Sequence, residues 1–263
     1  MAAVADAVDI ERRAPAVQPL TPRRSFRRDP VRAFRALRRL LADKEDTAAV
    51  FELMRALAGK AVPRGYARLL GSVEGGRIAY ERDEFAERLS DRAWLESFGP
   101  GTVGAAYRDF IAPRGLSAEG LAEESRKVPG SEIDAAHPFA WYGRRLRDVH
   151  DVWHVLTGYG TDGLGEACLV AFSYQQTRSL GFAVIAHAAR REMRKSGAPA
   201  PYAGAVAEAF RNGKRAAWLP AVDYPALFAE DLESARRRLG IVRPVVYESI
   251  PPEFRDRQAM MAA

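Results

Sequence analysis

The amino-acid sequence predicts a single compact multi-helix domain of the all-α class. Apolar residues recur at intervals of three and four along most of the chain, which is the period of an amphipathic helix. Glycine and proline punctuate these stretches, whereas the alternating pattern of a β-strand is scarce. The 263 residues are 48% hydrophobic, which is enough for a sizeable core and excludes disorder of the whole chain.

The chain is expected to divide into a tail, a domain and a second tail. Residues 1–29 contain six arginines and several prolines with little periodicity, which predicts a disordered basic tail. The arginines of this tail are either solvated or in contact with anionic lipid. Residues 30–245 form the predicted helical domain, and residues 246–263 form an extended C-terminal tail.

The first half of the domain predicts short helices. The first of them begins at Pro30, and its apolar stripe consists of Val31, Phe34, Leu37, Leu40 and Leu41. Residues 71–76, which include three glycines, predict a turn. Further helices are expected over about residues 46–58, 63–70, 82–97, 103–111 and 117–126.

The second half predicts longer helices. One runs from Pro138 to Gly158, because proline is favoured at the first helical position and glycine just beyond the last. A glycine-rich loop over residues 159–164 leads to a helix over 164–195, whose apolar residues lie on nearly all sides and predict burial. The remaining expected elements are helices over 202–213 and 224–239 and an extended segment over 242–246.

Composition restricts the classes of partner. Arginine and lysine number 40 against 34 aspartate and glutamate, which gives a net charge of +6, and only five of the basic residues are lysine. Guanidinium groups pair well with carboxylate or phosphate, so a modest preference for an anionic partner is expected. Nucleic acid is not expected, because no basic motif is interleaved with aromatic residues. The single Cys168 excludes a disulfide framework and a thiolate zinc site.

The sequence also predicts where the chain resides. It contains neither a run of 18 uncharged apolar residues nor the charged start and apolar core of a secretory signal. Asp6, Asp9 and Glu11 argue against a mitochondrial transit peptide, which is poor in acidic residues. We therefore expect a cytosolic chain that does not span a bilayer.

The strongest chemical signal comes from two of the four histidines. His150 and His154 stand four residues apart in a predicted helix, so their side chains differ by about 40° around its axis, and Asp151 falls within the same arc. Two imidazoles and a carboxylate that converge in this way suit a divalent cation. The glycine-rich hairpin is expected to bring Glu166 to the same side as a fourth ligand. The alternative is an ordinary amphipathic helix with no bound ion.

The ligand set restricts the ion. Two nitrogen and two oxygen ligands without a thiolate predict one divalent metal ion, with zinc as the expected ion and manganese, cobalt, iron or magnesium as alternatives. If three side chains bind, one coordination position stays open for water or substrate, and the site is then catalytic rather than structural.

This pattern resembles a known family. His150-Asp151-x-x-His154, followed after eleven residues by Glu166, resembles the HDxxH-x11-E signature of the Coq4 family of ubiquinone biosynthesis proteins. Residues 147–167 and 171–177 resemble the central block of that family, and weaker similarity extends over about residues 30–245.

The resemblance implies an all-α protein of ubiquinone (coenzyme Q) biosynthesis that associates peripherally with a membrane. It implies that His150, Asp151, His154 and Glu166 bind the metal and form the catalytic site. The implied reaction removes the C1 carboxylate of a 4-hydroxy-3-methoxy-5-polyprenylbenzoate-type ring and replaces it by hydroxyl. The protein is then a metal-dependent oxidative decarboxylase, which is a carbon–carbon lyase.

The resemblance also implies partners and a location. The partners are the polyprenylated aromatic substrate, an anionic membrane surface and the other coenzyme Q biosynthesis enzymes, and a homodimer is an open alternative. The location is the cytoplasmic side of the bacterial inner membrane, or the matrix side of the mitochondrial inner membrane if the chain is eukaryotic.

Other functions stay open on the residues alone. One is a non-catalytic lipid-binding scaffold that organises the coenzyme Q biosynthetic enzymes, with the metal holding the hairpin together. Another is a zincin-like hydrolase, because HDxxH is similar to HExxH, although aspartate is shorter than the usual glutamate base. Arg145 and Arg147 flank the histidine motif and are candidate substrate-binding residues for a carboxylate or phosphate, with surface or structural ion pairs as the alternative.

Overall fold

The computed structural model describes residues 26–43, 46–114, 118–128, 133–195 and 200–255. The regular elements in these ranges are α-helices and short 3-10 helices, and an isolated bridge pairs Thr102 with Asp231. The predicted all-α fold is therefore confirmed. Of the predicted basic tail, residues 1–25 lie outside the described residues, and Phe26 packs edge-on against Phe139.

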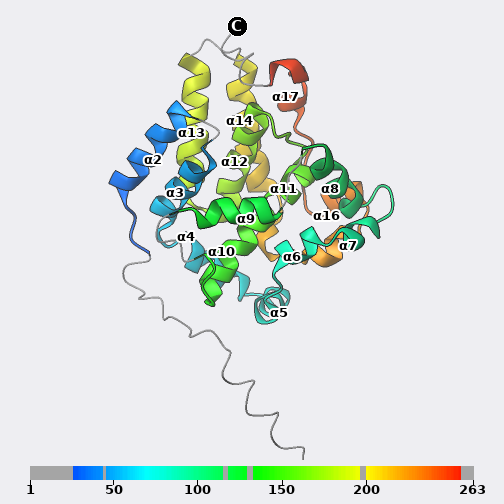
Figure 1. Ribbon diagram of the computed structural model, residues 1–263. Coiled ribbons are helices and arrows are strands. Elements are labelled where there is room, and N and C mark those ends of the chain that lie inside the picture. The colour runs from blue at the N-terminus through cyan, green and yellow to red at the C-terminus, as the bar shows by residue number, and fades with distance from the viewer. Residues whose placement is uncertain (1–25, 44–45, 115–117, 129–132, 196–199, 256–263) are drawn as a thin grey trace, which may run out of the picture.

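The centre of the fold is α12 (Gly163–Thr177), which is buried on nearly all sides as its apolar sequence predicts. It packs against α13 (Leu180–Lys195) and α14 (Ala200–Arg215), and the three helices lie beside one another in Figure 1. Gly213 allows the close approach of α14, because a Cβ there would lie 2.5 Å from the Phe172 carbonyl oxygen. The largest apolar cluster surrounds α12 and α11 (His150–Thr157).

The first described helix buries a different face from the predicted one. α2 (Pro30–Ala42) packs against α3 (Thr47–Ala58). The predicted stripe is wrong in part, since Val31, Phe34 and Leu41 are 61%, 60% and 41% exposed. Small side chains allow two helices to approach closely, so α2 turns its alanines toward α3 and its larger apolar residues outward. The buried residues of α2 are Ala33, Ala36 and Leu40.

Four short helices follow: α4 (Ala61–Leu69), α5 (Val73–Glu81), α6 (Phe85–Ser90) and α7 (Arg92–Glu96). The turn predicted over residues 71–76 is present at residues 71–72 but wrong beyond them, because α5 begins at Val73 and the Ser72 hydroxyl caps it by accepting from the Gly75 amide. The single helix predicted over residues 82–97 is also wrong. Asp91 ends α6 and caps α7 by accepting from the Trp94 amide.

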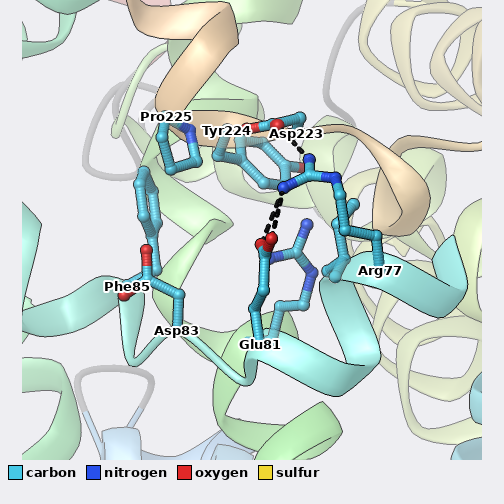
Figure 2. Close-up of a pocket in the computed structure, with 9 residues that line it drawn as sticks. Arg77, Glu81, Asp83, Phe85, Asp223, Tyr224 and Pro225 are labelled. Carbon is cyan, nitrogen blue, oxygen red and sulfur yellow. Dashed lines mark hydrogen bonds and ion pairs between the residues drawn. The ribbon is translucent and has the colours of Figure 1, made fainter. Parts of the chain in front are cut away.

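A group of charged side chains fastens α5 to the C-terminal half of the chain. The Arg77 guanidinium donates to Glu81 on its own helix and to Asp223, which caps α15 (Tyr224–Phe228), as Figure 2 shows. The cavity beside these residues has a volume of about 30 Å³. This volume accommodates water but no aromatic substrate, so the cavity is not a candidate active site.

The remaining predicted helices are present, but three of them are interrupted. α8 (Val103–Ile111) and α9 (Ala118–Arg126) agree with the predictions. α10 (Pro138–Asp148) is separated from α11 by Val149, and Arg178 with φ 56° lies between α12 and α13. Residues 224–239 form α15 and α16 (Leu232–Arg238). The apolar period continues across each break, so periodicity does not reveal the change of direction.

The C-terminal segment differs from the extended chain that the sequence predicts. α17 (Val245–Glu248) and a 3-10 turn (Pro252–Phe254) occupy it as far as residue 255, because α17 packs on α14. Residues 256–263 of the predicted tail lie outside the described residues. None of the described helices is both long enough and apolar enough to cross a bilayer.

Candidate metal centre

Four side chains with metal-ligand chemistry meet where α11 turns back into α12. α11 presents His150, Asp151 and His154 on one side, and Glu166 lies in the first turn of α12. The Glu166 side chain is 42% exposed and that of His150 is 25% exposed, whereas His154 is only 1% exposed. The centre is therefore open on one side and buried on the other.

The side-chain nitrogen and oxygen atoms of these residues lie close enough together to bind one metal ion. Ligand atoms of His150, Asp151 and His154 lie within 4.8 Å of one another, so this triad could hold a metal ion. The Glu166 carboxylate faces both imidazoles, with 3.7 Å from its Oε2 to His150 Nε2 and 3.3 Å from its Oε1 to His154 Nε2. The structure thus brings together all four residues that the sequence nominates, and their role as ligands stays a prediction.

The hydrogen bonding of His154 fits a bound cation. Its Nδ1 lies 3.0 Å from the Tyr159 carbonyl oxygen, which only accepts, so Nδ1 carries a proton. In the neutral ring Nε2 is then an acceptor, and it is buried without a hydrogen-bond partner among the described residues. The ionised Glu166 carboxylate that faces Nε2 is also an acceptor. A metal ion held by these two residues would satisfy both groups, and metal-binding histidines characteristically donate their other nitrogen in this way.

The electrostatics of the centre favour a cation as well. Burial by itself raises the pKa of Glu166, but the two imidazoles that face its carboxylate, those of His150 and His154, outweigh burial and hold this pKa well below its usual range. Burial lowers the pKa of His150, but Glu166 and Asp151 outweigh it and raise this pKa above its ordinary value. Both shifts show that the negative charges of the centre stabilise positive charge placed beside them.

Two aromatic residues of α8 form the buried wall, and no sequence spacing singles them out. The Phe110 ring stacks on the His154 ring with 5.5 Å between centroids and 23° between planes. Tyr107 is fully buried, and its hydroxyl has no hydrogen-bond partner among the described residues. Burial and the charges of Asp151 and Asp148 raise the pKa of Tyr107, so its hydroxyl stays protonated.

Two of the glycines between α11 and α12 are required because no side chain fits, and one adopts a left-handed backbone conformation. Gly158 has φ 79° and ends α11 in the left-handed region. A Cβ on Gly160 would lie 2.6 Å from Asp162 Oδ2, and a Cβ on Gly165 would lie 2.1 Å from the Gly160 carbonyl oxygen. The loop backbone therefore contacts the backbone of the first turn of α12, which holds the Glu166 carboxylate near the histidines.

The two arginines that flank the motif point into the protein. Arg145 is 4% exposed and donates to the carbonyl oxygens of Pro220 and Val222. Arg147 is 9% exposed and pairs with Asp148 at 2.7 Å. These contacts favour the structural alternative for both guanidinium groups, and their substrate-binding role stays a prediction.

The fold and the site define an all-helical protein with a candidate divalent-metal centre in a helix hairpin. The family described as coenzyme Q (ubiquinone) biosynthesis protein Coq4 matches residues 22–245. The chain therefore belongs to the Coq4 family of ubiquinone biosynthesis proteins, as its signature predicts.

Individual relatives agree with this assignment. The mitochondrial ubiquinone biosynthesis protein coq-4 of Neurospora crassa is 28% identical over 192 residues, which cover 72% of this chain and 52% of that protein. The mitochondrial COQ4 homolog of Rattus norvegicus is 28% identical over 171 residues, which cover 65% of this chain and 62% of that protein. The chain thus spans between about half and two thirds of the length of these relatives.

A solved structure supports the fold. The crystal structure of a proposed ubiquinone biosynthesis protein from Nostoc punctiforme is similar with a TM-score of 0.56 and 21% sequence identity. The similarity covers 81% of this chain and 99% of that one. At this identity the comparison establishes the shared helical fold.

Proposed function

We propose that this protein binds one divalent metal ion through His150, Asp151, His154 and Glu166 and acts on a polyprenylated 4-hydroxybenzoate-type ring, exchanging the C1 carboxylate for hydroxyl. The observation that carries the proposal is the buried His154 Nε2, which has no hydrogen-bond partner in the described part of the chain and faces the Glu166 carboxylate at 3.3 Å. Membership of the Coq4 family supports ubiquinone biosynthesis as the pathway.

The proposed reaction breaks the bond between C1 and the carboxylate, releases CO₂ and forms a carbon–oxygen bond. It is a two-electron oxidation of the ring. Water supplies the hydroxyl oxygen, and dioxygen, which becomes hydrogen peroxide, or another two-electron acceptor takes up the two electrons and two protons. A bound divalent ion would supply a Lewis acid that draws charge from the carboxylate or phenolate of the substrate.

The residues of the chain position the reactants. Phe110 and Tyr159 hold the His154 ring on the buried side, where water is excluded. Glu166 stays ionised near neutral pH because its pKa is lowered, so it supplies negative charge rather than a proton. The exposed side of the centre, at His150 and Glu166, is where a substrate ring can enter.

The reaction is tested by deleting the gene and restoring it. The deletion strain should lose ubiquinone and accumulate a carboxylated polyprenyl-phenol, and the wild-type gene should reverse both changes. Extracted lipids are measured by mass spectrometry, and metal analysis of the purified protein should give about one ion per chain. Normal quinone levels in the deletion strain, without the intermediate, would exclude the proposed reaction.

We also propose that the outward face of α2 docks on an anionic membrane surface. This face carries the exposed apolar residues Val31, Phe34 and Leu41 together with the exposed Arg35 and Arg38. Neither arginine has an ion-pair partner among the described residues. Exposed apolar side chains beside free cations are the composition of a helix that lies in a lipid headgroup region.

A groove beside this face suits an isoprenoid chain. It has a volume of about 460 Å³ and is lined mainly by apolar residues of α2, α3 and α13, including Leu37, Leu41, Leu57, Leu180 and Val184. Leu41 belongs both to the groove and to the outward face of α2, so a chain that leaves the membrane can enter the groove directly. We propose the polyprenyl tail of the substrate as its occupant.

Membrane docking is tested with vesicles that contain phosphatidylserine or cardiolipin. The double substitution Arg35→Gln/Arg38→Gln should weaken vesicle binding about 30-fold, because each arginine near an anionic surface contributes about 1 kcal/mol. Co-sedimentation measures the partition coefficient. Arg92→Gln/Arg237→Gln is the control, since it removes the same charge from α7 and α16. Equal loss of binding in both variants would contradict docking through α2.

A further inference from the structure

We infer that Tyr247 is a positioning residue for the metal centre, because its hydroxyl fixes the loop that orients the His154 imidazole. The inference rests on the metal site proposed above. Tyr247 lies in α17, beyond the segment 22–245 that matches the family. It is 2% exposed, so its hydroxyl is available only to neighbours within the protein.

The direction of His154 depends on the loop that follows α11. Within the described ranges, the His154 imidazole makes one hydrogen bond, from Nδ1 to the Tyr159 carbonyl oxygen at 3.0 Å. That bond selects the tautomer in which Nε2 offers a lone pair to a cation. A movement of the Tyr159 carbonyl that breaks this bond therefore removes the restraint on both the tautomer and the ring orientation.

The hydroxyl of Tyr247 joins the middle of this loop to its C-terminal end. It accepts from the Gly160 amide at 2.9 Å, next to Tyr159, and it donates to Asp162 Oδ2. Gly160 is in close contact with this hydroxyl, because a Cβ on it would lie 2.7 Å from the hydroxyl oxygen. One side-chain oxygen thus ties the peptide that orients His154 to the start of α12.

The same hydroxyl also holds Asp162, the N-cap residue of the helix that carries Glu166. Asp162 caps α12 with its other oxygen, Oδ1, which accepts from the Gly165 amide at 2.8 Å, and its carbonyl accepts from the Glu166 amide at 2.9 Å. The two ligands that face each other at 3.3 Å, His154 and Glu166, are therefore both anchored through Tyr247.

Tyr247 is itself held firmly. Its ring contacts the Tyr159 ring edge-on, with 5.4 Å between the ring centroids and 77° between the ring planes. The Arg255 guanidinium lies over the face of the Tyr247 ring, 4.3 Å from its centroid. The Arg255 carbonyl accepts from the Leu164 amide at 3.2 Å, which adds a second link between the C-terminal segment and the start of α12. Residues 245–255 thus hold the loop in place through contacts of Tyr247 and Arg255.

The test compares metal binding by the wild type and by Tyr247→Phe, which removes the hydroxyl and keeps the ring contacts. We expect the dissociation constant for Zn(II) or Co(II) to rise 10- to 100-fold, the usual effect of losing a partner that orients a ligand. Competition with a chromophoric chelator measures this constant, and the visible absorption of the Co(II) form should change because the ligand geometry changes.

Tyr224→Phe is the matched control. The Tyr224 hydroxyl also accepts one hydrogen bond, from Trp153 Nε1, and donates one, to the Leu219 carbonyl, but it does not touch the loop. Both variants should lose similar thermal stability, whereas only Tyr247→Phe should lose metal affinity. An unchanged dissociation constant in Tyr247→Phe, or an equal rise in both variants, would overturn the inference.

A second measurement does not require metal. In the nitrogen-15 spectrum of metal-free protein, His154 should show the tautomer protonated at Nδ1, and Tyr247→Phe should show a mixture of tautomers. If the wild type binds no metal, the proposed function fails, and this spectrum still decides whether Tyr247 orients the ring. An identical tautomer in both proteins would overturn the positioning role.

Discussion

Glu166→Gln is expected to lower the affinity for Zn(II) or Co(II) by at least about 100-fold, which is more than the loss of an orienting partner causes. The carboxylate faces both imidazoles, and its lowered pKa keeps it ionised near neutral pH. Glutamine has nearly the same shape but no charge, and the side chain is 42% exposed, so the fold should persist. Chelator competition measures the affinity, and circular dichroism checks the fold.

Glu74→Gln is the control for this substitution. Glu74 also lies in the first turn of a helix, its side chain is 55% exposed, and it also pairs with a basic residue, Arg77. We expect Glu74→Gln to bind metal like the wild type and to restore ubiquinone in the deletion strain, whereas Glu166→Gln should do neither. Wild-type affinity in Glu166→Gln would contradict its role as a ligand.

The same variant separates an enzyme from a scaffold. If Glu166→Gln keeps its association with the other coenzyme Q biosynthesis enzymes but loses turnover, the scaffold alternative is excluded. If association and turnover fall together while the fold persists, the metal serves assembly and the proposed reaction is contradicted.

Gly165→Ala is expected to lower the free energy of unfolding by about 3 kcal/mol or more. This is a large share of the total free energy of unfolding of a typical domain, which is about 5–15 kcal/mol. A Cβ at this position would lie 2.1 Å from the Gly160 carbonyl oxygen, and backbone cannot move aside as a flexible side chain does. The expected fall in Tm is about 6 °C or more. Metal affinity should fall as well, because the first turn of α12 is pushed away from the loop.

Gly76→Ala is the matched control for this clash. Gly76 lies within α5, and a Cβ there would meet nothing within 4 Å. Because alanine is a better helix former than glycine, this change should raise stability by up to about 1 kcal/mol. Thermal unfolding followed by circular dichroism measures both variants, and a wild-type Tm for Gly165→Ala would contradict the contact.

Most helices of the fold could be predicted from the sequence, whereas several of their boundaries and exposed faces could not. The pattern of residues 103–111 predicts α8 correctly, because spacing and end signals are local. The break at Val149 and the exposed face of α2 were not predictable, since an apolar period is the same whether the helix continues or turns. Which face of α2 is buried depends on the shape of α3, which lies elsewhere in the chain.

By itself, the sequence determined that His150, Asp151 and His154 share one face of a helix, because the angle between residues one and four apart is set within a single turn. It also indicated Glu166 through the short hairpin. Only the tertiary structure decided what surrounds these candidate ligands. Phe110 of α8 reaches His154, and Tyr247 of α17 reaches the adjoining loop, by packing of distant segments that no local spacing encodes. His154 Nε2 is buried there and faces a carboxylate.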